Sequence, residues 1–203
     1  MIRLDLRHKA FGSTSVLGEI ELEIKAGEHV ALLGPSGIGK TTLLNILTGL
    51  DQDFDGTLAS RSRIGMVFQE PRLLAWRSAL ENLMLVSGCS KETALDAMAA
   101  MGLSGKEDNF PSQMSLGQQR RLSLARAFAI EPELLVLDEP FTSLDHALVQ
   151  EMLELTRSLA RSRGMAILLV THSGPEADFL ADIHYRLEGT PARLRRIEGL
   201  TDQ

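Results

Sequence analysis

The chain has 203 residues, 44% of them hydrophobic, which is enough to bury one sizeable core in a globular protein. Its formal net charge of -6 argues against a nucleic-acid-binding surface, which needs clustered Lys and Arg, so we expect no nucleic-acid partner. The single cysteine, Cys89, excludes an internal disulfide, and nothing requires an oxidising compartment.

The sequence predicts no membrane-spanning or targeting segment. No apolar run approaches the roughly 20 residues that cross a bilayer. The first residues, MIRLDLRHKAFG, lack the continuous apolar core of a signal peptide. We therefore expect a cytoplasmic protein that would reach a membrane only through another chain.

Two kinds of β-strand are predicted. Residues 2–7 and 19–24 alternate apolar and polar side chains, which is typical of half-exposed antiparallel strands. Four further segments are short, unbroken apolar runs of the kind found in buried parallel strands, at residues 29–34, 64–68, 133–138 and 165–170. These alternate with helical patterns, which predicts an α/β fold in three layers, with a mostly parallel sheet core and an antiparallel part at the N-terminus.

Helical patterns occupy the stretches between the strands. Ser78 and Glu81 form a predicted capping box that opens one helix, and a second helix at residues 90–102 ends at Gly102. Four apolar residues at helical spacing predict another helix packed on the sheet, namely Leu148, Met152, Leu155 and Leu159.

The distribution of these elements predicts the domain organisation. Strand-like runs are absent from Gln69 to about Ile130, where only helical patterns occur. We therefore expect one domain, in which residues 1–69 and 131–203 form the core and residues 70–130 form an inserted helical subdomain.

The strongest chemical signal is GPSGIGKTT, which fits the G-x-x-x-x-G-K-[ST] phosphate-binding pattern between a predicted strand and a predicted helix. Glycines let such a loop wrap round a polyphosphate with its N–H groups inward, and the following helix adds a positive dipole. Lys40 supplies a charge for the β and γ phosphates, and Thr41 offers a hydroxyl to Mg²⁺. An ordinary Gly-rich turn is the alternative, and the flanking elements argue against it. The predicted nucleotide-binding residues of this loop are Gly34, Pro35, Ser36, Gly37, Ile38, Gly39, Lys40, Thr41 and Thr42.

A second signal is LLVLDEP, in which a buried strand ends in two adjacent carboxylates, Asp138 and Glu139. Ligand sites of α/β sheets lie at this end of the strands. Asp138 can hold Mg²⁺, and Glu139 can act on a water molecule as a general base. A solvated turn is the alternative, which a neighbouring phosphate loop makes much less favourable.

Three single residues have weaker signals. His172 ends the strand-like run AILLV and can donate a hydrogen bond to a γ-phosphate, although a histidine there is usually structural. Phe11 alone would be interpreted as a core ring. Gln69, which ends another apolar strand, indicates little by itself.

The stretch MSLGQQRRLSLARA begins with Ser115 and Gln118 at N-cap and N3 spacing, which predicts a capping box and a helix start. In chain order the sequence then shows a phosphate loop, a Gln after a strand, Ser-x-Gly-Gln at a helix start, LLVLDEP, SLD and VTH. This order resembles the nucleotide-binding subunits of ATP-binding cassette (ABC) transporters over essentially the whole chain.

The resemblance implies an ATP-hydrolysing enzyme that uses ATP and Mg²⁺. Phe11 matches the aromatic residue that stacks on adenine, and Gln69 matches the glutamine that reaches Mg²⁺ and the attacking water. Glu139 matches the catalytic acid, and His172 matches the histidine that senses the γ-phosphate. The catalytic residues implied are Lys40, Gln69, Glu139 and His172, and the metal ligands implied are Thr41, Gln69 and Asp138.

The resemblance also implies a head-to-tail dimer, a homodimer or a pair with another ATPase subunit, with ATP between the two subunits. The family signature, Leu-Ser-Gly-Gly-Gln, falls at residues 114–118, where the helix start faces the γ-phosphate held by the opposite subunit. Asp145 matches a loop that crosses to the partner. The residues implied to contact the partner's nucleotide are Ser115, Gly117, Gln118 and Asp145.

This signature departs from the family pattern at Met114 and Leu116, which replace the usual Leu and the first Gly. The change at position 116 matters more, because it lies near the partner's phosphate. With Ser115 as N-cap, Leu116 is predicted to be the first helical residue, a backbone conformation that a Leu adopts without strain.

The segment VFQEPRLLAWRSALENL resembles the corresponding region in ATPases of nitrate, sulfonate and taurine importers. The resemblance implies integral membrane permease subunits as partners and a solute-binding protein as an indirect one, which places the chain on the cytoplasmic face of the membrane. Trp76, with Leu73 and Leu74, would line a groove for the permease. A core position for Trp76 is the alternative.

Two other functions stay open. One is an ABC ATPase of an export or non-transport process, and the other is an ATP-dependent interaction module with low hydrolysis, for which Leu116 is the argument. A GTPase is disfavoured because no Asn-Lys-x-Asp follows to recognise guanine. The transported molecule cannot be predicted, since permease and binding protein select it.

Overall fold

Ten strands form two sheets in the computed structural model, which describes residues 1–142 and 144–198. The first sheet is antiparallel and has β1 at its centre, paired with β2, β3 and β5. Alternate side chains of β1 and β3 are buried, as predicted for strands with one solvated face. The bounds are β1 (Ile2–Phe11), β2 (Thr14–Leu17), β3 (Ile20–Ile24) and β5 (Asp55–Ser60).

The second sheet has six strands in the order β10-β9-β4-β8-β7-β6. Its neighbours are parallel except for the β9–β10 pair at one edge. The four predicted buried strands are confirmed as β4, β6, β7 and β8, whereas β9 and β10 were not predicted. The bounds are β4 (His29–Leu33), β6 (Ile64–Val67), β7 (Leu134–Asp138), β8 (Ala166–Thr171), β9 (Ile183–Glu188) and β10 (Arg193–Ile197).

Helices α2, α3 and α4 begin at the predicted positions, and both predicted capping boxes, at Ser78 and Ser115, are present, whereas α6 was not predicted. The second helix of the predicted insertion ends just before Gly102, which has φ 66°. Residues 70–130 form helices and contain no strand. The bounds are α1 (Lys40–Leu47), α2 (Ala79–Ser87), α3 (Lys91–Ala100), a 3₁₀-helix (Pro111–Gln113), α4 (Leu116–Phe128), α5 (His146–Ser162) and α6 (Gly174–Leu180).

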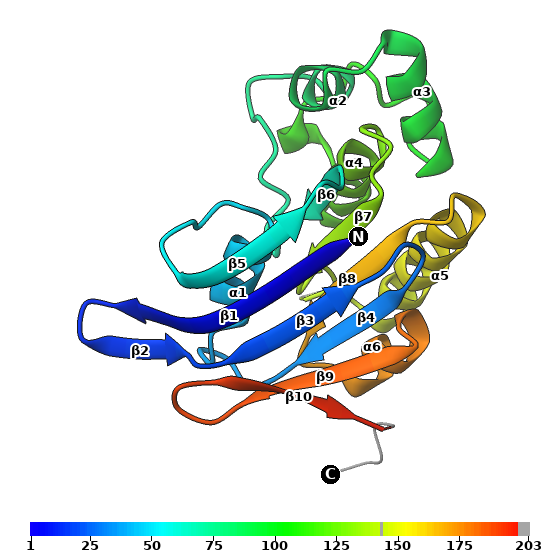
Figure 1. Ribbon diagram of the computed structural model, residues 1–203. Helices are drawn as coiled ribbons and strands as arrows, with labels where there is room; N and C mark the ends of the chain where they lie inside the picture. Colours follow the sequence, from blue (N-terminus) through cyan, green and yellow to red (C-terminus); the bar gives the residue numbers. More distant parts are fainter. Residues whose placement is uncertain (143, 199–203) are drawn as a thin grey trace.

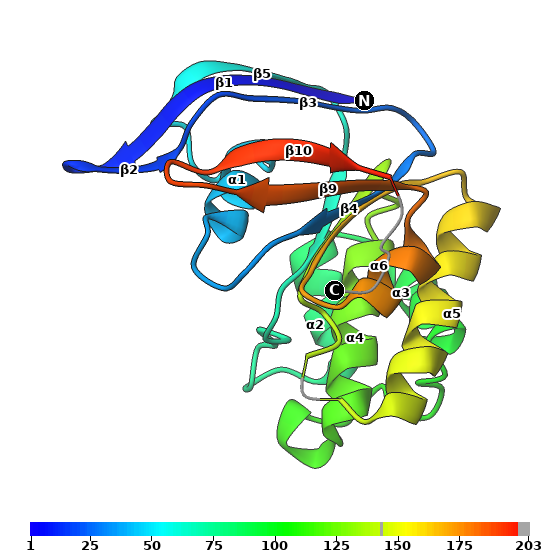
Figure 2. The same cartoon turned by 90° about the horizontal axis from the view of Figure 1, so that it is seen from below.

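Three layers result, as expected (Figures 1 and 2). Figure 2 shows the antiparallel sheet on one side of the six-stranded sheet and helices α2 to α6 on the other. Helix α1 shares one buried apolar cluster with both sheets, so the antiparallel sheet and α1 together cover one face. The outer layer on this side is therefore mostly β-structure, whereas the layer on the other side is helical.

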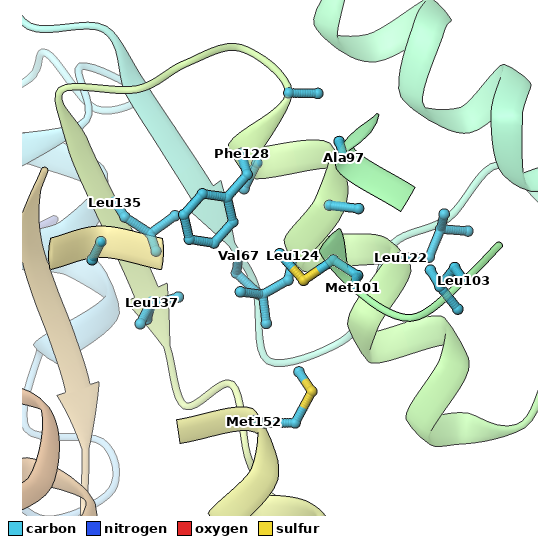
Figure 3. Packing of buried hydrophobic residues seen from close by; sticks show 14 of the residues in the cluster. Val67, Ala97, Met101, Leu103, Leu122, Leu124, Phe128, Leu135, Leu137 and Met152 are labelled. Atoms are coloured by element: carbon cyan, nitrogen blue, oxygen red, sulfur yellow. The ribbon is translucent and has the colours of Figure 1, made fainter. Parts of the chain in front are cut away.

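A second buried cluster joins the helices to the other face of the six-stranded sheet. Figure 3 shows Phe128 of α4 and Leu135 of β7 pointing toward one another, with Val67 of β6 beside Leu124. Met152 of α5 belongs to the same cluster. Apolar contacts therefore continue from the sheet into α4, so the orientation of this helix depends on the strands it packs against.

The carboxyl ends of the parallel strands bring the predicted site residues to one edge of the sheet. Gly34 follows β4, Gln69 follows β6, Asp138 ends β7 and His172 follows β8. Because β4, β8, β7 and β6 are consecutive neighbours, residues that are distant in sequence meet at this edge.

Candidate functional site

The phosphate-binding loop connects β4 to α1 and has the backbone of an anion-binding turn. Gly39 is the N-cap of α1, with φ 109° and ψ 12°, and no side chain caps the helix. A Cβ atom at Gly39 would lie 2.8 Å from Cδ2 of Leu17, so both the backbone conformation and the space favour glycine. The first N–H groups of α1 are therefore free of a capping side chain and can bind phosphate oxygens.

Lys40 is the first residue of α1 and is only 6% exposed. Its ammonium donates hydrogen bonds to the carbonyl oxygens of Gly34 (2.9 Å) and Pro35 (3.1 Å). The same nitrogen lies 3.4 Å from Oε1 of Glu139. These three contacts hold the Lys40 ammonium at the phosphate loop, where a bound phosphate would meet its charge.

Glu139 lies between Lys40 and His172. Its Oε2 is 3.5 Å from Nδ1 of His172, whose side chain is 60% exposed. The backbone of Glu139 has φ 45°, a left-handed conformation that is uncommon for a residue with a side chain, and its N–H donates to the carbonyl of Val170 (2.9 Å). A strained backbone held in this way fixes the direction of the carboxylate.

Asp138 is the last residue of β7 and is buried. Burial first, and then the neighbouring Glu139 carboxylate, raise the pKa of Asp138, while the Lys40 ammonium opposes both. Asp138 forms no ion pair with any described residue (1–142 and 144–198). A buried carboxylate in this state would gain from a bound cation.

The other predicted residues of this site surround the cluster at the sheet edge. Thr41 is exposed on the first turn of α1, and Gln69 is exposed just after β6. Phe11 ends β1 and is 56% exposed, which excludes a core position. Its ring lies 4.7 Å from the ammonium of Lys9, which in turn pairs with Asp51 (2.9 Å).

A second surface carries the signature residues. A groove of about 550 Å³ is lined by residues at the start of α4 and near the start of α5, including Ser115, Leu116, Gly117, Gln118, Asp145 and Leu148. Asp145 caps α5 by accepting a hydrogen bond from the N–H of Leu148 (2.9 Å). The described lining includes no residue of the phosphate loop, so the two predicted binding surfaces are separate. Ser143 of the predicted SLD motif lies outside the described residues.

The start of α4 shows how this chain accommodates Leu116 in place of the first glycine of the family signature. Leu116 is the first residue of α4, has no positive φ and is 46% exposed, which confirms the predicted helical conformation. At Gly117 a Cβ atom would lie 2.8 Å from Cδ2 of Leu148 in α5, so a larger residue would have to displace this half-buried side chain. Packing therefore favours glycine at position 117, whereas position 116 accommodates an exposed side chain.

The segment after Gln69 presents Trp76, which is 71% exposed, so a core position is wrong. Leu73 packs against the helical side of the core. Buried Asn82 holds the peptide groups of Leu74, accepting from its N–H (2.7 Å) and donating to its carbonyl (3.1 Å). The exposed indole therefore lies on an ordered segment.

Cavity volume alone does not mark the site. A hollow of about 630 Å³ lies at the opposite, amino ends of the parallel strands, where its lining includes Ala26, Arg63, Glu133 and Met165. None of the sequence-predicted site residues lines it. The predicted site residues gather instead at the carboxyl ends of the strands, where ligand sites of α/β sheets lie.

Comparison with known proteins identifies the family. Residues 17–142 match the family model described as ABC transporter. The chain belongs to the ABC transporter family. It is 42% identical over 183 residues to the aliphatic sulfonates import ATP-binding protein SsuB 1 of Streptomyces avermitilis, covering 89% of this chain and 70% of that protein. The SsuB protein of Granulibacter bethesdensis is 43% identical over 184 residues, with coverage of 90% and 77%.

Solved structures support the fold. A dimeric structure of a post-hydrolysis state of the ATP-binding cassette MJ0796 bound to ADP and Pi superimposes with a TM-score of 0.84. The two sequences are 27% identical, and the match covers 98% of this chain and 100% of that one. The predicted P-loop ABC ATPase fold is confirmed, and this ABC transporter subunit binds and hydrolyses ATP. Within residues 1–142 and 144–198, no helix has the length and hydropathy to span a membrane.

Proposed function

We propose that the chain is the ATPase subunit of an importer of sulfonates or chemically similar organic anions. Support comes from the 42% and 43% identity to proteins named as aliphatic sulfonates import ATP-binding proteins, each spanning about nine-tenths of this chain. In this proposal the subunit is attached to the cytoplasmic face of the membrane by permease subunits, and a solute-binding protein delivers the substrate.

The proposed division of labour follows the predicted domain organisation. Residues 1–69 and 131–198 act as the nucleotide-binding core, and residues 70–130 act as a helical subdomain with the signature. Trp76 supports a permease contact because an exposed indole on an ordered segment is typical of interface residues.

The residues at the sheet edge fit Mg²⁺. Asp138 offers a buried carboxylate without an ion-pair partner among the described residues, and Thr41 and Gln69 offer a hydroxyl and an amide oxygen. Hard oxygen ligands of this kind suit Mg²⁺, which usually keeps several waters and binds through one or two protein groups plus phosphates. When bound, the ion neutralises charge on the β and γ phosphates.

Each side chain then has a defined task. Lys40 and the free N–H groups of α1 hold the phosphates, and Phe11 stacks on the base. Glu139 accepts a proton from the attacking water, while Lys40 and His172, at 3.4 and 3.5 Å, hold its carboxylate in place. His172 donates a hydrogen bond to the γ-phosphate.

We infer that two copies are needed for hydrolysis. In this chain the signature groove and the phosphate loop are separate surfaces, and a head-to-tail pair would place Ser115, Gly117, Gln118 and Asp145 of one copy over the ATP of the other. The helix start at Ser115 carries a positive dipole that suits a γ-phosphate. The exposed Leu116 leaves this helix start accessible, which disfavours an interaction module with impaired hydrolysis.

The observation that carries the catalytic assignment is the position of Glu139 beside both Lys40 and His172. Glu139→Gln keeps the shape but removes the base, so this variant should bind Mg-ATP, fail to hydrolyse it and accumulate as a dimer on size-exclusion chromatography. Lys40→Ala is the control and should lose ATP binding. A Glu139→Gln protein that stays monomeric and hydrolyses ATP normally would exclude both the base role and the dimer.

The import function has a separate test. The purified complex with its permease, in vesicles with a solute-binding protein, should show ATP turnover that rises when an alkanesulfonate is added and not when sulfate is added. Turnover that rises only with a substrate on the ATPase side of the membrane would indicate export instead.

A further inference from the structure

A buried arginine joins two loops at the edge of the ATP site. Arg120 lies in α4 and is only 6% exposed. One guanidinium nitrogen donates to the carbonyl of Gln69, and the other donates to the carbonyl of Thr142 at 3.3 Å. Arg120 forms no ion pair within the described residues. Its guanidinium is therefore held by main-chain carbonyls.

Both carbonyls belong to residues that control the proposed chemistry. Gln69 is the proposed Mg²⁺ and water ligand, so fixing its peptide group fixes the point from which its side chain extends. The N–H of Thr142 donates to the carbonyl of Glu139 at 3.4 Å, which closes the turn that follows the proposed base. A continuous chain of hydrogen bonds thus runs from Gln69 through Arg120 to Glu139.

The helix that carries Arg120 adds a third connection. Helix α4 begins directly after its N-cap, Ser115, and Arg120 lies in its second turn. A buried charge is costly unless it is fully hydrogen-bonded, and burial already lowers the pKa of Arg120. The buried Nε of Arg120 already lacks a hydrogen-bond partner among the described residues, so separating either loop from α4 would leave a further guanidinium N–H without one.

We propose that Arg120 is a positioning residue for ATP hydrolysis, which holds the Gln69 loop, the turn after Glu139 and the signature helix as one unit. This inference rests on the proposed roles of Gln69 and Glu139. Arg120 donates to the main-chain carbonyls of Gln69 and Thr142, and it acts on the rate through the geometry of the two loops. Loss of its hydrogen bonds displaces reacting groups without removing any group that binds ATP.

The neighbouring Arg126 provides a matched control. It lies in the same helix, is 7% exposed and has a pKa lowered by burial, like Arg120. Its guanidinium also donates to two main-chain carbonyls, those of Pro71 and Arg72, both at 2.9 Å. Replacement of either arginine removes a similar set of contacts, but only Arg120 contacts Gln69 and Thr142.

The experiment compares Arg120→Met, Arg126→Met and Arg120→Gln in the full chain. Arg120→Met should lower kcat by a factor on the order of 10 to 100, the cost of a displacement of about 1 Å at reacting groups, while KM for ATP changes by less than about threefold. Arg126→Met should lower the melting temperature by about as much as Arg120→Met does, but it should reduce kcat by much less. Arg120→Gln retains amide donors and should recover part of kcat.

A second measurement separates positioning from folding. In a Glu139→Gln background, Arg120→Met should still bind ATP but form less dimer on size-exclusion chromatography, because the signature helix is displaced. Equal losses of kcat in both Met variants, in proportion to their melting temperatures, would overturn the inference and leave the proposed ATPase function intact. Absence of ATP hydrolysis by the unmodified protein would contradict the proposed function itself.

Discussion

Gly39 offers a test of how the phosphate loop achieves its shape. An alanine there would place Cβ 2.8 Å from Cδ2 of Leu17 and 3.1 Å from Cγ1 of Val16, on a backbone with φ 109°. The positive φ costs about 1–2 kcal/mol for a residue with a side chain. Overpacking against two apolar side chains adds about 1–3 kcal/mol. We therefore expect Gly39→Ala to lower the free energy of unfolding by about 2–5 kcal/mol.

Gly37→Ala is the matched control in the same loop. Gly37 also has a positive φ, 78°, but a Cβ atom there would meet nothing within 4 Å. Its expected cost is the conformational part alone, about 1–2 kcal/mol. Urea denaturation without nucleotide measures both variants, and isothermal titration measures their ATP affinity.

The ATP affinity should follow the same order as the stability. A loop that relaxes by shifting away from Leu17 no longer directs its N–H groups at the phosphates, so Gly39→Ala should weaken ATP binding by about tenfold or more, which is about 1.4 kcal/mol. Equal losses of stability in the two variants would refute the steric argument. Unchanged ATP affinity in Gly39→Ala would refute the phosphate cradle.

Two further predictions concern Glu176 and Leu116. Glu176 accepts a hydrogen bond from the Thr171 hydroxyl (2.6 Å), and burial raises its pKa, so the folded state binds the proton more tightly and this carboxyl costs stability as pH rises. Glu176→Gln should therefore stabilise the protein against urea at pH 7.5 and much less near pH 4.5; a constant difference would contradict this. Leu116→Gly should change ATP turnover by less than about tenfold, or ~1.4 kcal/mol in the barrier, and a far larger gain would show that Leu116 impairs the signature.

The buried parallel strands could be predicted because each is a continuous apolar run between helical patterns. Strand β9 lacks that signal, since Leu187 is its only buried side chain, and β10 is an arginine-rich edge strand. Short β2 and β5 gain their stability from pairing with β1, which local sequence does not encode. The strands that the sequence did not predict therefore depend on pairing with strands that are distant in the chain or on position at a sheet edge.

The same distinction holds within the site. The phosphate loop could be predicted because its residues are contiguous, and the capping boxes because their spacing is local. Arg120 gave no signal, because its partners lie 51 and 22 residues away and an arginine in a helix is usually exposed. Lys9, whose ammonium lies over the Phe11 ring, was missed because its carboxylate partner Asp51 lies 42 residues away. The position of Trp76 could be decided only by the structure.

The signature of this chain separates two requirements that a pair of glycines otherwise meets together. In the proposed dimer, the helix start exposes free N–H groups to the partner's phosphate, and the helix lies close to α5. The capping box uses the N–H groups of Ser115 and Gln118, so the N–H groups left to meet the first requirement are those of Leu116 and Gly117, whatever the side chain at position 116. Gly117 meets the second, because a Cβ atom there would have to displace the Leu148 side chain of α5. In the proposed dimer, a signature with one glycine is therefore expected to support hydrolysis when that glycine is the one facing α5.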